Sequence, residues 1–133
     1  MKVIKEVMVI DDDSTLVFLA EKFIELTDMV QTVTSFNDGH AAFNTLIERD
    51  KSKQALPDII LLDITMQDWD AWRTLDELKT VGLFDKLCIY IVTSSASRED
   101  REHAKFYHLE DFYLEKPISP EVLKSIFESH LGK

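Results

Sequence analysis

Four short apolar runs in this sequence end in polar side chains that could do chemistry together. Residues 7–10 and 59–62 are followed by acids, residues 87–92 by hydroxyls, and residues 112–114 by an acid, a lysine and a proline. An acid at the end of a buried run costs several kcal/mol unless it is solvated, paired or bound to a cation. The repeated pattern therefore indicates one shared polar site, and its candidates are Asp11, Asp12, Asp63, Thr93 and Lys116.

Phosphoryl transfer is the chemistry that this set of side chains could support. Three converging carboxylates repel one another unless a cation neutralises them, and Mg²⁺ prefers such hard oxygen ligands. A lysine and a hydroxyl could hold a transferring phosphoryl group, whose catalysis depends mostly on positioning and charge neutralisation. A carboxylate can itself be the nucleophile. We expect that nucleophile to be Asp63, because it stands alone between the acid cluster and the hydroxyl run.

The elements that must position these side chains alternate regularly along the chain. The four apolar runs predict strands of a sheet covered on both faces, and residues 30–36 predict a fifth strand. Segments with helical periodicity lie between them. Alternation of this kind predicts an α/β fold with a parallel sheet. Ligands bind beyond the carboxyl ends of strands in such sheets, and all the candidate residues lie there.

The helices carry recognisable start and stop signals. On the first helix, Leu16, Leu19, Phe23 and Leu26 have the spacing of one apolar face. Gly82 is expected to help end the third helix. Asp13 is expected to be a turn or cap residue. The residues expected to cap the five helices are Ser14, Asn37, Asp70, Ser97 and Ser119.

Composition restricts the class of protein. We expect one domain over residues 1–133, since 45% hydrophobic residues suffice for a continuous core. The net charge of −10 opposes direct binding to nucleic acid or anionic lipid. No membrane span or signal peptide is evident, and the single cysteine, Cys88, suits a reducing compartment. We therefore expect a cytoplasmic protein.

Four motifs, in this order along the chain, resemble those of a known protein family. These motifs are "VIDDDS", "IILLDITM", "IYIVTSS" and "YLEKP". With them the chain resembles the response-regulator receiver domain of two-component phosphorelays over essentially its whole length. The resemblance implies a flavodoxin-like (βα)5 fold with strand order 2-1-3-4-5. It also implies a signalling protein that catalyses only its own phosphorylation and slow dephosphorylation. Because the sequence ends at Lys133, we expect a stand-alone receiver without an output domain.

The resemblance also implies a role for each site residue. Asp63 would accept the phosphoryl group, and Asp12 would ligate Mg²⁺ directly, with Asp11 assisting through water. Asp63 itself and the backbone carbonyl of Thr65 would complete the protein ligands. Lys116 would pair with the phosphate.

The same resemblance implies a conformational switch and the protein partners of the domain. Thr93 would bond a phosphoryl oxygen, and Tyr113 would be the aromatic switch residue, although a plain core or surface role is the alternative for it. The donor would be a sensor histidine kinase or a histidine phosphotransfer protein. A downstream protein would bind the surface of the fourth helix, fifth strand and fifth helix.

Two departures and two alternatives remain open. Gln67 and Ala71 stand where the family usually has proline and glycine, so the loop after the acceptor could differ in shape. The glycine that is common before the fifth strand is also absent, and "HLED" stands in its place. A Mg²⁺-dependent phosphohydrolase could also form an aspartyl phosphate, but the haloacid dehalogenase type needs an acid where Thr65 stands. A non-phosphorylated adaptor with this fold is the second alternative. Nucleotide binding is disfavoured, because the sequence has no GxxxxGK[ST] motif.

Overall fold

The computed structural model describes residues 3–64, 71–94 and 97–132, and a five-stranded parallel sheet organises them. The strand order is β2-β1-β3-β4-β5, as the sequence resemblance predicted. The strands are β1 (Ile4–Ile10), β2 (Val30–Phe36), β3 (Ile59–Asp63), β4 (Ile89–Thr93) and β5 (Tyr113–Glu115). The helices are α1 (Ser14–Thr27), α2 (Gly39–Lys51), α3 (Ala71–Thr80), α4 (Arg98–Phe106) and α5 (Pro120–Leu131), with a short 3₁₀ turn, η1 (Phe84–Lys86), before β4.

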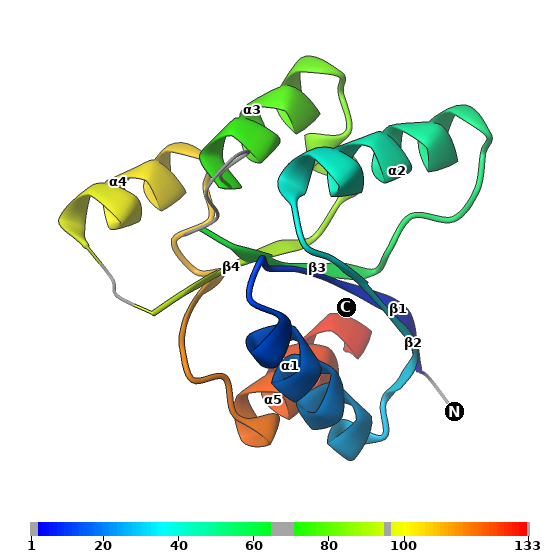
Figure 1. Cartoon of the computed structure of the whole chain (residues 1–133), viewed down its shortest axis with the longest axis vertical. Coiled ribbons are helices and arrows are strands. Elements are labelled where there is room, and N and C mark those ends of the chain that lie inside the picture. The colour runs from blue at the N-terminus through cyan, green and yellow to red at the C-terminus, as the bar shows by residue number, and fades with distance from the viewer. Residues whose placement is uncertain (1–2, 65–70, 95–96, 133) are drawn as a thin grey trace.

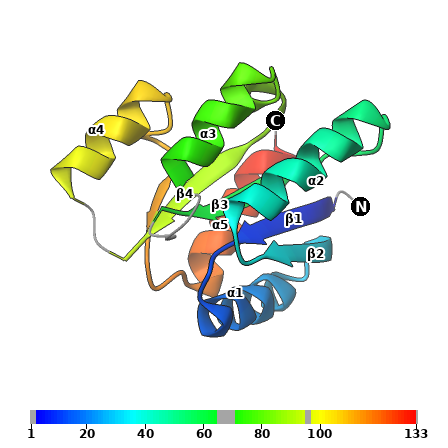
Figure 2. The same cartoon turned by 45° about the horizontal axis from the view of Figure 1, so that its top comes forward.

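Helices cover the sheet on both faces (Figure 1). One layer contains α2, α3 and α4, and the other contains α1 and α5. The view in Figure 2 shows β2 at one edge of the sheet, beside β1. Because both faces of the central strands are covered, all five residues of β3 and all five of β4 are buried.

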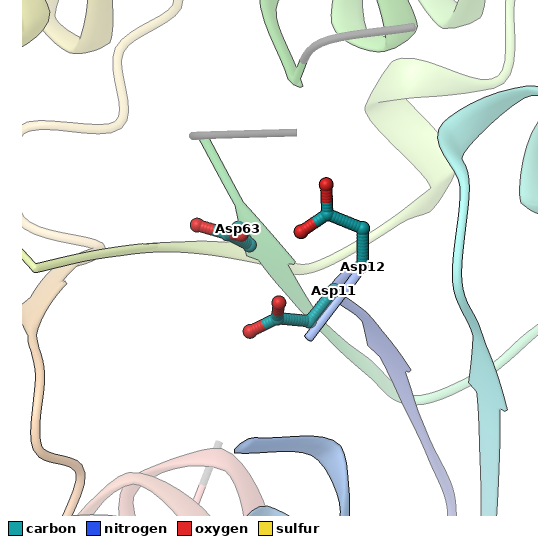
Figure 3. Close-up of side chains that lie close together, drawn as sticks. All are labelled: Asp11, Asp12 and Asp63. Atoms are coloured by element: carbon teal, nitrogen blue, oxygen red, sulfur yellow. The ribbon is translucent and has the colours of Figure 1, made fainter. Parts of the chain in front are cut away.

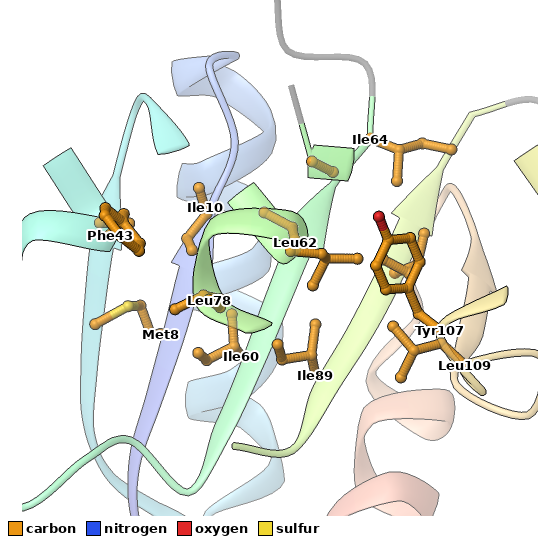
Figure 4. Close-up of a cluster of buried hydrophobic side chains, with 14 of the residues drawn as sticks. Met8, Ile10, Phe43, Ile60, Leu62, Ile64, Leu78, Ile89, Tyr107 and Leu109 are labelled. Atoms are coloured by element: carbon orange, nitrogen blue, oxygen red, sulfur yellow. The ribbon is translucent and has the colours of Figure 1, made fainter. Parts of the chain in front are cut away.

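The alternation of side chains along the strands divides the core in two. Met8 and Ile10 of β1 belong to the cluster beneath α2 and α3, part of which is drawn in Figure 4. Val7 and Val9 belong to the cluster beneath α1 and α5. Each large apolar side chain buried in this way contributes about 1.5–3 kcal/mol, so the two cores hold the strand ends in fixed positions.

The helix caps confirm part of the sequence prediction and correct part of it. Ser97 and Ser119 cap α4 and α5, each accepting a hydrogen bond from a backbone N–H of the first turn. Gly82 follows α3 with a φ of 79°, which favours glycine. The predictions of Ser14 and Asn37 were each wrong by one residue, because the side chains of Asp13 and Asp38 reach the free N–H groups instead. The predicted cap Asp70 lies outside the described residues.

Replacing Asp13 by Ala should lower the free energy of unfolding by about 1 kcal/mol, because its carboxylate accepts hydrogen bonds from the N–H groups of Thr15 and Leu16. The matched control is Ser14→Ala, which removes the cap that the sequence suggested and should change stability by less than about 0.5 kcal/mol. Urea unfolding of both variants measures the difference. Equal losses of stability in the two variants would contradict the assignment of the cap to Asp13.

The apolar face predicted for α1 is only partly correct. Leu19 and Leu26 are 39% and 70% exposed, whereas the buried residues of the helix are Ala20 and Ile24. Val17 packs on the same core. The helix is apolar around most of its circumference, so a 3.6-residue period fits more than one choice of inner face.

Candidate functional site

The predicted site residues lie at one edge of the sheet because the strands that carry them are parallel. Asp11 follows β1, Asp63 ends β3, Thr93 ends β4 and Lys116 follows β5. The register places Ile10 beside Leu62, Asp63 beside Val92, and Thr93 beside Glu115. Residues separated by up to 105 positions therefore meet at the carboxyl ends of adjacent strands.

Three carboxylates form the centre of the site (Figure 3). One oxygen from each of Asp11, Asp12 and Asp63 lies within 4.8 Å of the other two. Asp63 is 2% exposed and Asp11 is 6% exposed, whereas Asp12 faces solvent. The cluster is therefore enclosed by the sheet on one side and accessible from the side of Asp12.

Lys116 is the cation that faces this cluster. Its Nζ atom lies 3.0 Å from Oδ2 of Asp11 and 3.6 Å from Oδ1 of Asp63. The lysine side chain is only 12% exposed, so water screens these contacts less than it screens surface ion pairs. One ammonium is thus placed between two buried carboxylates.

The environment of Asp11 opposes its ionisation. Burial raises the pKa of Asp11, and the nearby charge of Asp63 raises it further. A hydrogen bond from the backbone N–H of Asp13, 2.9 Å from Oδ1, acts in the opposite direction, as does the contact with Lys116. Burial is the largest of these influences, so the net upward shift reflects the cost of holding a charge in a site partly removed from water.

The donor set fits a hard divalent cation. Three carboxylates face one ammonium, and all the ligand atoms that the cluster offers are oxygens. Mg²⁺ usually takes one or two carboxylates and keeps several waters, which the exposed side of Asp12 permits. Softer ions would favour sulfur or imidazole ligands, and the cluster contains neither.

Thr93 is the last residue of β4, and Tyr113 is the first residue of β5, where it pairs with Ile91. Thr93 is fully buried. The Tyr113 hydroxyl is also buried and has no hydrogen-bond partner among the described residues. Burial raises the pKa of Tyr113, and the charge of Asp100 adds to this effect, while the charge of Arg101 and a contact with Thr93 lower it. A buried hydroxyl without a good partner is costly.

Some predicted features of the site involve residues outside the described ranges. Thr65 and Gln67 lie outside the described residues, so neither the expected carbonyl ligand nor the loop after the acceptor is placed. Ala71 is the first residue of α3 and is fully buried. The sequence prediction missed the N–H of Asp13 as a support for Asp11, which a turn directly after the strand could have suggested.

A doubly wound sheet with acids at its carboxyl edge defines a class of α/β proteins, and comparison with known proteins identifies the family. Residues 7–128 match the model of the response regulator receiver domain. The chain therefore belongs to the response regulator receiver domain family, and its function is that of a receiver in two-component signalling.

Individual relatives agree with this assignment. The two-component response regulator ARR14 of Arabidopsis thaliana is 30% identical over 122 residues, which cover 92% of this chain. The signal transduction histidine-protein kinase BarA of Escherichia coli is 32% identical over 125 residues, or 94% of this chain. A crystal structure of a two component response regulator from Cytophaga hutchinsonii superposes with a TM-score of 0.87 at 28% identity, covering 99% of this chain and 100% of that one.

The curated relatives are much longer than this chain. It spans 30% of the length of ARR14 and 13% of the length of BarA. Receiver domains of this family interact with histidine kinases or phosphotransfer proteins. Within the part of the chain that the structure describes, no helix has the length and apolar character needed to cross a membrane.

Proposed function

We propose that Asp63 accepts a phosphoryl group from a phosphohistidine donor, with Mg²⁺ bound at the acid cluster. The observation that supports this most strongly is the position of Asp63, whose carboxylate is 2% exposed, lies 3.6 Å from Nζ of Lys116 and belongs to the three-acid cluster. Asp63 faces both a cation and a group of oxygens suited to a metal ion.

Transfer requires attack by a carboxylate oxygen of Asp63 on phosphorus. The new bond joins that oxygen to phosphorus, and the bond between phosphorus and the donor imidazole breaks, so that its electron pair stays on the imidazole nitrogen. The ammonium of Lys116 pairs with the phosphoryl oxygens, and the Thr93 hydroxyl donates to one of them. Both groups stabilise the charge that is present during transfer.

Mg²⁺, when bound, supplies the remaining neutralisation of charge between the acids and the phosphoryl oxygens. Asp12 and Asp63 would hold it directly, the Thr65 carbonyl would be a further ligand, and Asp11 would assist through water. Asp11 suits this indirect role because its Oδ2 atom is already 3.0 Å from Lys116.

Phosphorylation adds about two negative charges and three acceptor oxygens at Asp63. Thr93 moves towards the phosphoryl group, and the Tyr113 ring, whose hydroxyl lacks a partner in the described structure, moves into the space that is released. A minor conformation thereby becomes the major one. The surface of α4, β5 and α5 then presents a changed face to a downstream protein.

The charge of the whole molecule supports protein partners. A net charge of −10 opposes direct contact with nucleic acid or anionic lipid. We further propose that residues 1–133 form one receiver domain that acts in the cytoplasm, and that it turns over no external substrate. The phosphohydrolase alternative lacks its second acid, since Thr65 stands there.

Incubation with acetyl phosphate and Mg²⁺ tests this function. Intact-mass measurement should show a gain of one phosphoryl group with Mg²⁺ and almost none when the metal is chelated. Steady hydrolysis of p-nitrophenyl phosphate in the same buffer would favour the phosphohydrolase. A chain that gains no mass from either acetyl phosphate or a phosphorylated histidine phosphotransfer protein would be an adaptor.

A further inference from the structure

The free edge of β2 differs from the other edge of the sheet. β2 has seven residues, whereas β5, at the opposite edge, has three and ends in the exposed Glu115. Natural edge strands are usually protected by charges, prolines or short length, because their unpaired backbone groups can pair with another chain. β5 has two of these protections.

The side chains of β2 provide neither a charge nor a proline to protect this edge. Residues 29–37 contain neither a charged residue nor a proline, and charges return only at Asp28 and Asp38. The whole edge strand is therefore uncharged, in a chain in which 30% of residues are charged. Because the molecule carries a net charge of −10, two copies repel each other over most of their surface. β2 adds no charge of its own to such a repulsion.

The backbone of β2 is correctly oriented for such pairing. The carbonyl of Phe36 accepts a hydrogen bond from the N–H of Asp11, at 3.1 Å, so the backbone groups of Phe36 point towards β1. Backbone groups alternate in direction along a strand, and those of Val33 and Ser35 therefore point outward. In the described sheet β2 is an edge strand that pairs with β1 on its other side, so no described strand bonds these outward groups.

An exposed aromatic side chain lies next to this edge. Phe18 of α1 is 58% exposed and lines the same groove as Ser35. Figure 2 shows α1 beneath β1 and β2 with no other element beyond the edge strand. A chain added to β2 would thus gain backbone hydrogen bonds from the strand and an apolar contact from Phe18.

We propose that a second copy of this chain pairs with β2 through its own β2, in antiparallel orientation about a two-fold axis. Each copy then supplies the same uncharged strand, so the contact is self-complementary and closes after two copies. The two sheets become one continuous sheet, and the outward groups of Val33 and Ser35 become hydrogen bonded. The acid cluster lies at the carboxyl edge of the sheet and takes no part in the contact.

Sedimentation velocity and amide hydrogen exchange of the unphosphorylated protein test this pairing. The protein should change from monomer to dimer between low micromolar and near-millimolar concentration, and added salt should strengthen the association by screening the repulsion between copies. The amides of Val33 and Ser35 should exchange more slowly as concentration rises. Those of Thr34 and Phe36, which face β1, should be protected at every concentration.

A pair of matched variants makes the test specific. Ser35→Lys places a positive charge at the edge without removing an inward hydrogen bond, and it should weaken dimerisation at least about fivefold. Ser125→Lys on the exposed side of α5 makes the same change in net charge and should leave dimerisation as in the wild type. Circular dichroism establishes that both variants are folded.

Three results would overturn the proposal. The first is a protein that stays monomeric at all concentrations and salt levels. The second is a dimer in which the Val33 and Ser35 amides exchange as fast as in the monomer. The third is a Ser35→Lys protein that dimerises as tightly as the Ser125→Lys control. The exchange experiment uses the unmodified protein, so it decides the question even if Ser35→Lys fails to fold.

Discussion

Replacement of Lys116 by Met should slow phosphorylation by acetyl phosphate about 100-fold, the scale expected when one electrostatic group is removed from a transfer site. It should also lower the free energy of unfolding in Mg²⁺-free buffer by about 3 kcal/mol, because breaking a buried ion pair leaves its charges uncompensated. Here two buried carboxylates, Asp11 and Asp63, lose their ammonium. Met keeps most of the apolar stem of the lysine, so loss of packing contributes little.

The same variant should respond to metal more strongly than the wild type does. Without the ammonium, Mg²⁺ would replace the positive charge that Lys116 supplies to the cluster, and it should restore much of the lost stability. Lys124→Met on the exposed surface of α5 is the control, and it should change stability by less than about 0.5 kcal/mol. Urea unfolding with and without Mg²⁺ measures both effects. A Lys116→Met protein with wild-type stability and phosphorylation rate would show that this lysine does not serve the site.

Replacement of Asp12 by Ala should weaken Mg²⁺ binding at least about tenfold. Two unit charges 4 Å apart interact by about 1 kcal/mol in water and about 4 kcal/mol near a protein surface, and the metal carries two charges. Asp12 is the exposed member of the cluster, so its removal should barely affect the core. In Mg²⁺-free buffer the variant should be as stable as the wild type or slightly more stable, because one repelling carboxylate is gone.

Asp13→Ala is the matched control for metal binding. It removes the same charge one residue away, from the side chain that caps α1 instead of the one that joins the cluster. Its Mg²⁺ affinity should stay within about threefold of the wild-type value, since an exposed charge outside the site is largely screened. Isothermal titration calorimetry with Mg²⁺ compares the variants. Equal losses of affinity in both would mean that only the total charge of residues 11–13 matters.

The polar site could be predicted from the sequence because parallel strands impose it. Once residues 7–10, 59–62 and 87–92 are identified as buried strands, their polar ends must meet at one edge. The structure places Asp63 and Lys116 there as expected. The prediction depended on the direction of the strands and on their adjacency, and the strand order itself came from the family resemblance.

The predictions that were wrong concern features that the local sequence pattern does not determine. Asp13 and Ser14 are adjacent, and both residue types can cap a helix. The direction in which the chain enters α1 selects Asp13. The face of α1 that packs inward depends on how α5 and the sheet meet it, which is a tertiary property. Leu26 fits the helical period and is nevertheless 70% exposed.

The central claim is that the carboxylate of Asp63 forms the bond to phosphorus, and residue-level mapping of the modification tests it most directly. After reaction with acetyl phosphate and Mg²⁺, borohydride converts an aspartyl phosphate to homoserine, which peptide mass spectrometry locates. We predict conversion at residue 63 in the wild type and at no position in Asp63→Asn. Conversion at Asp11 or Asp12, or undiminished conversion in Asp63→Asn, would contradict the account.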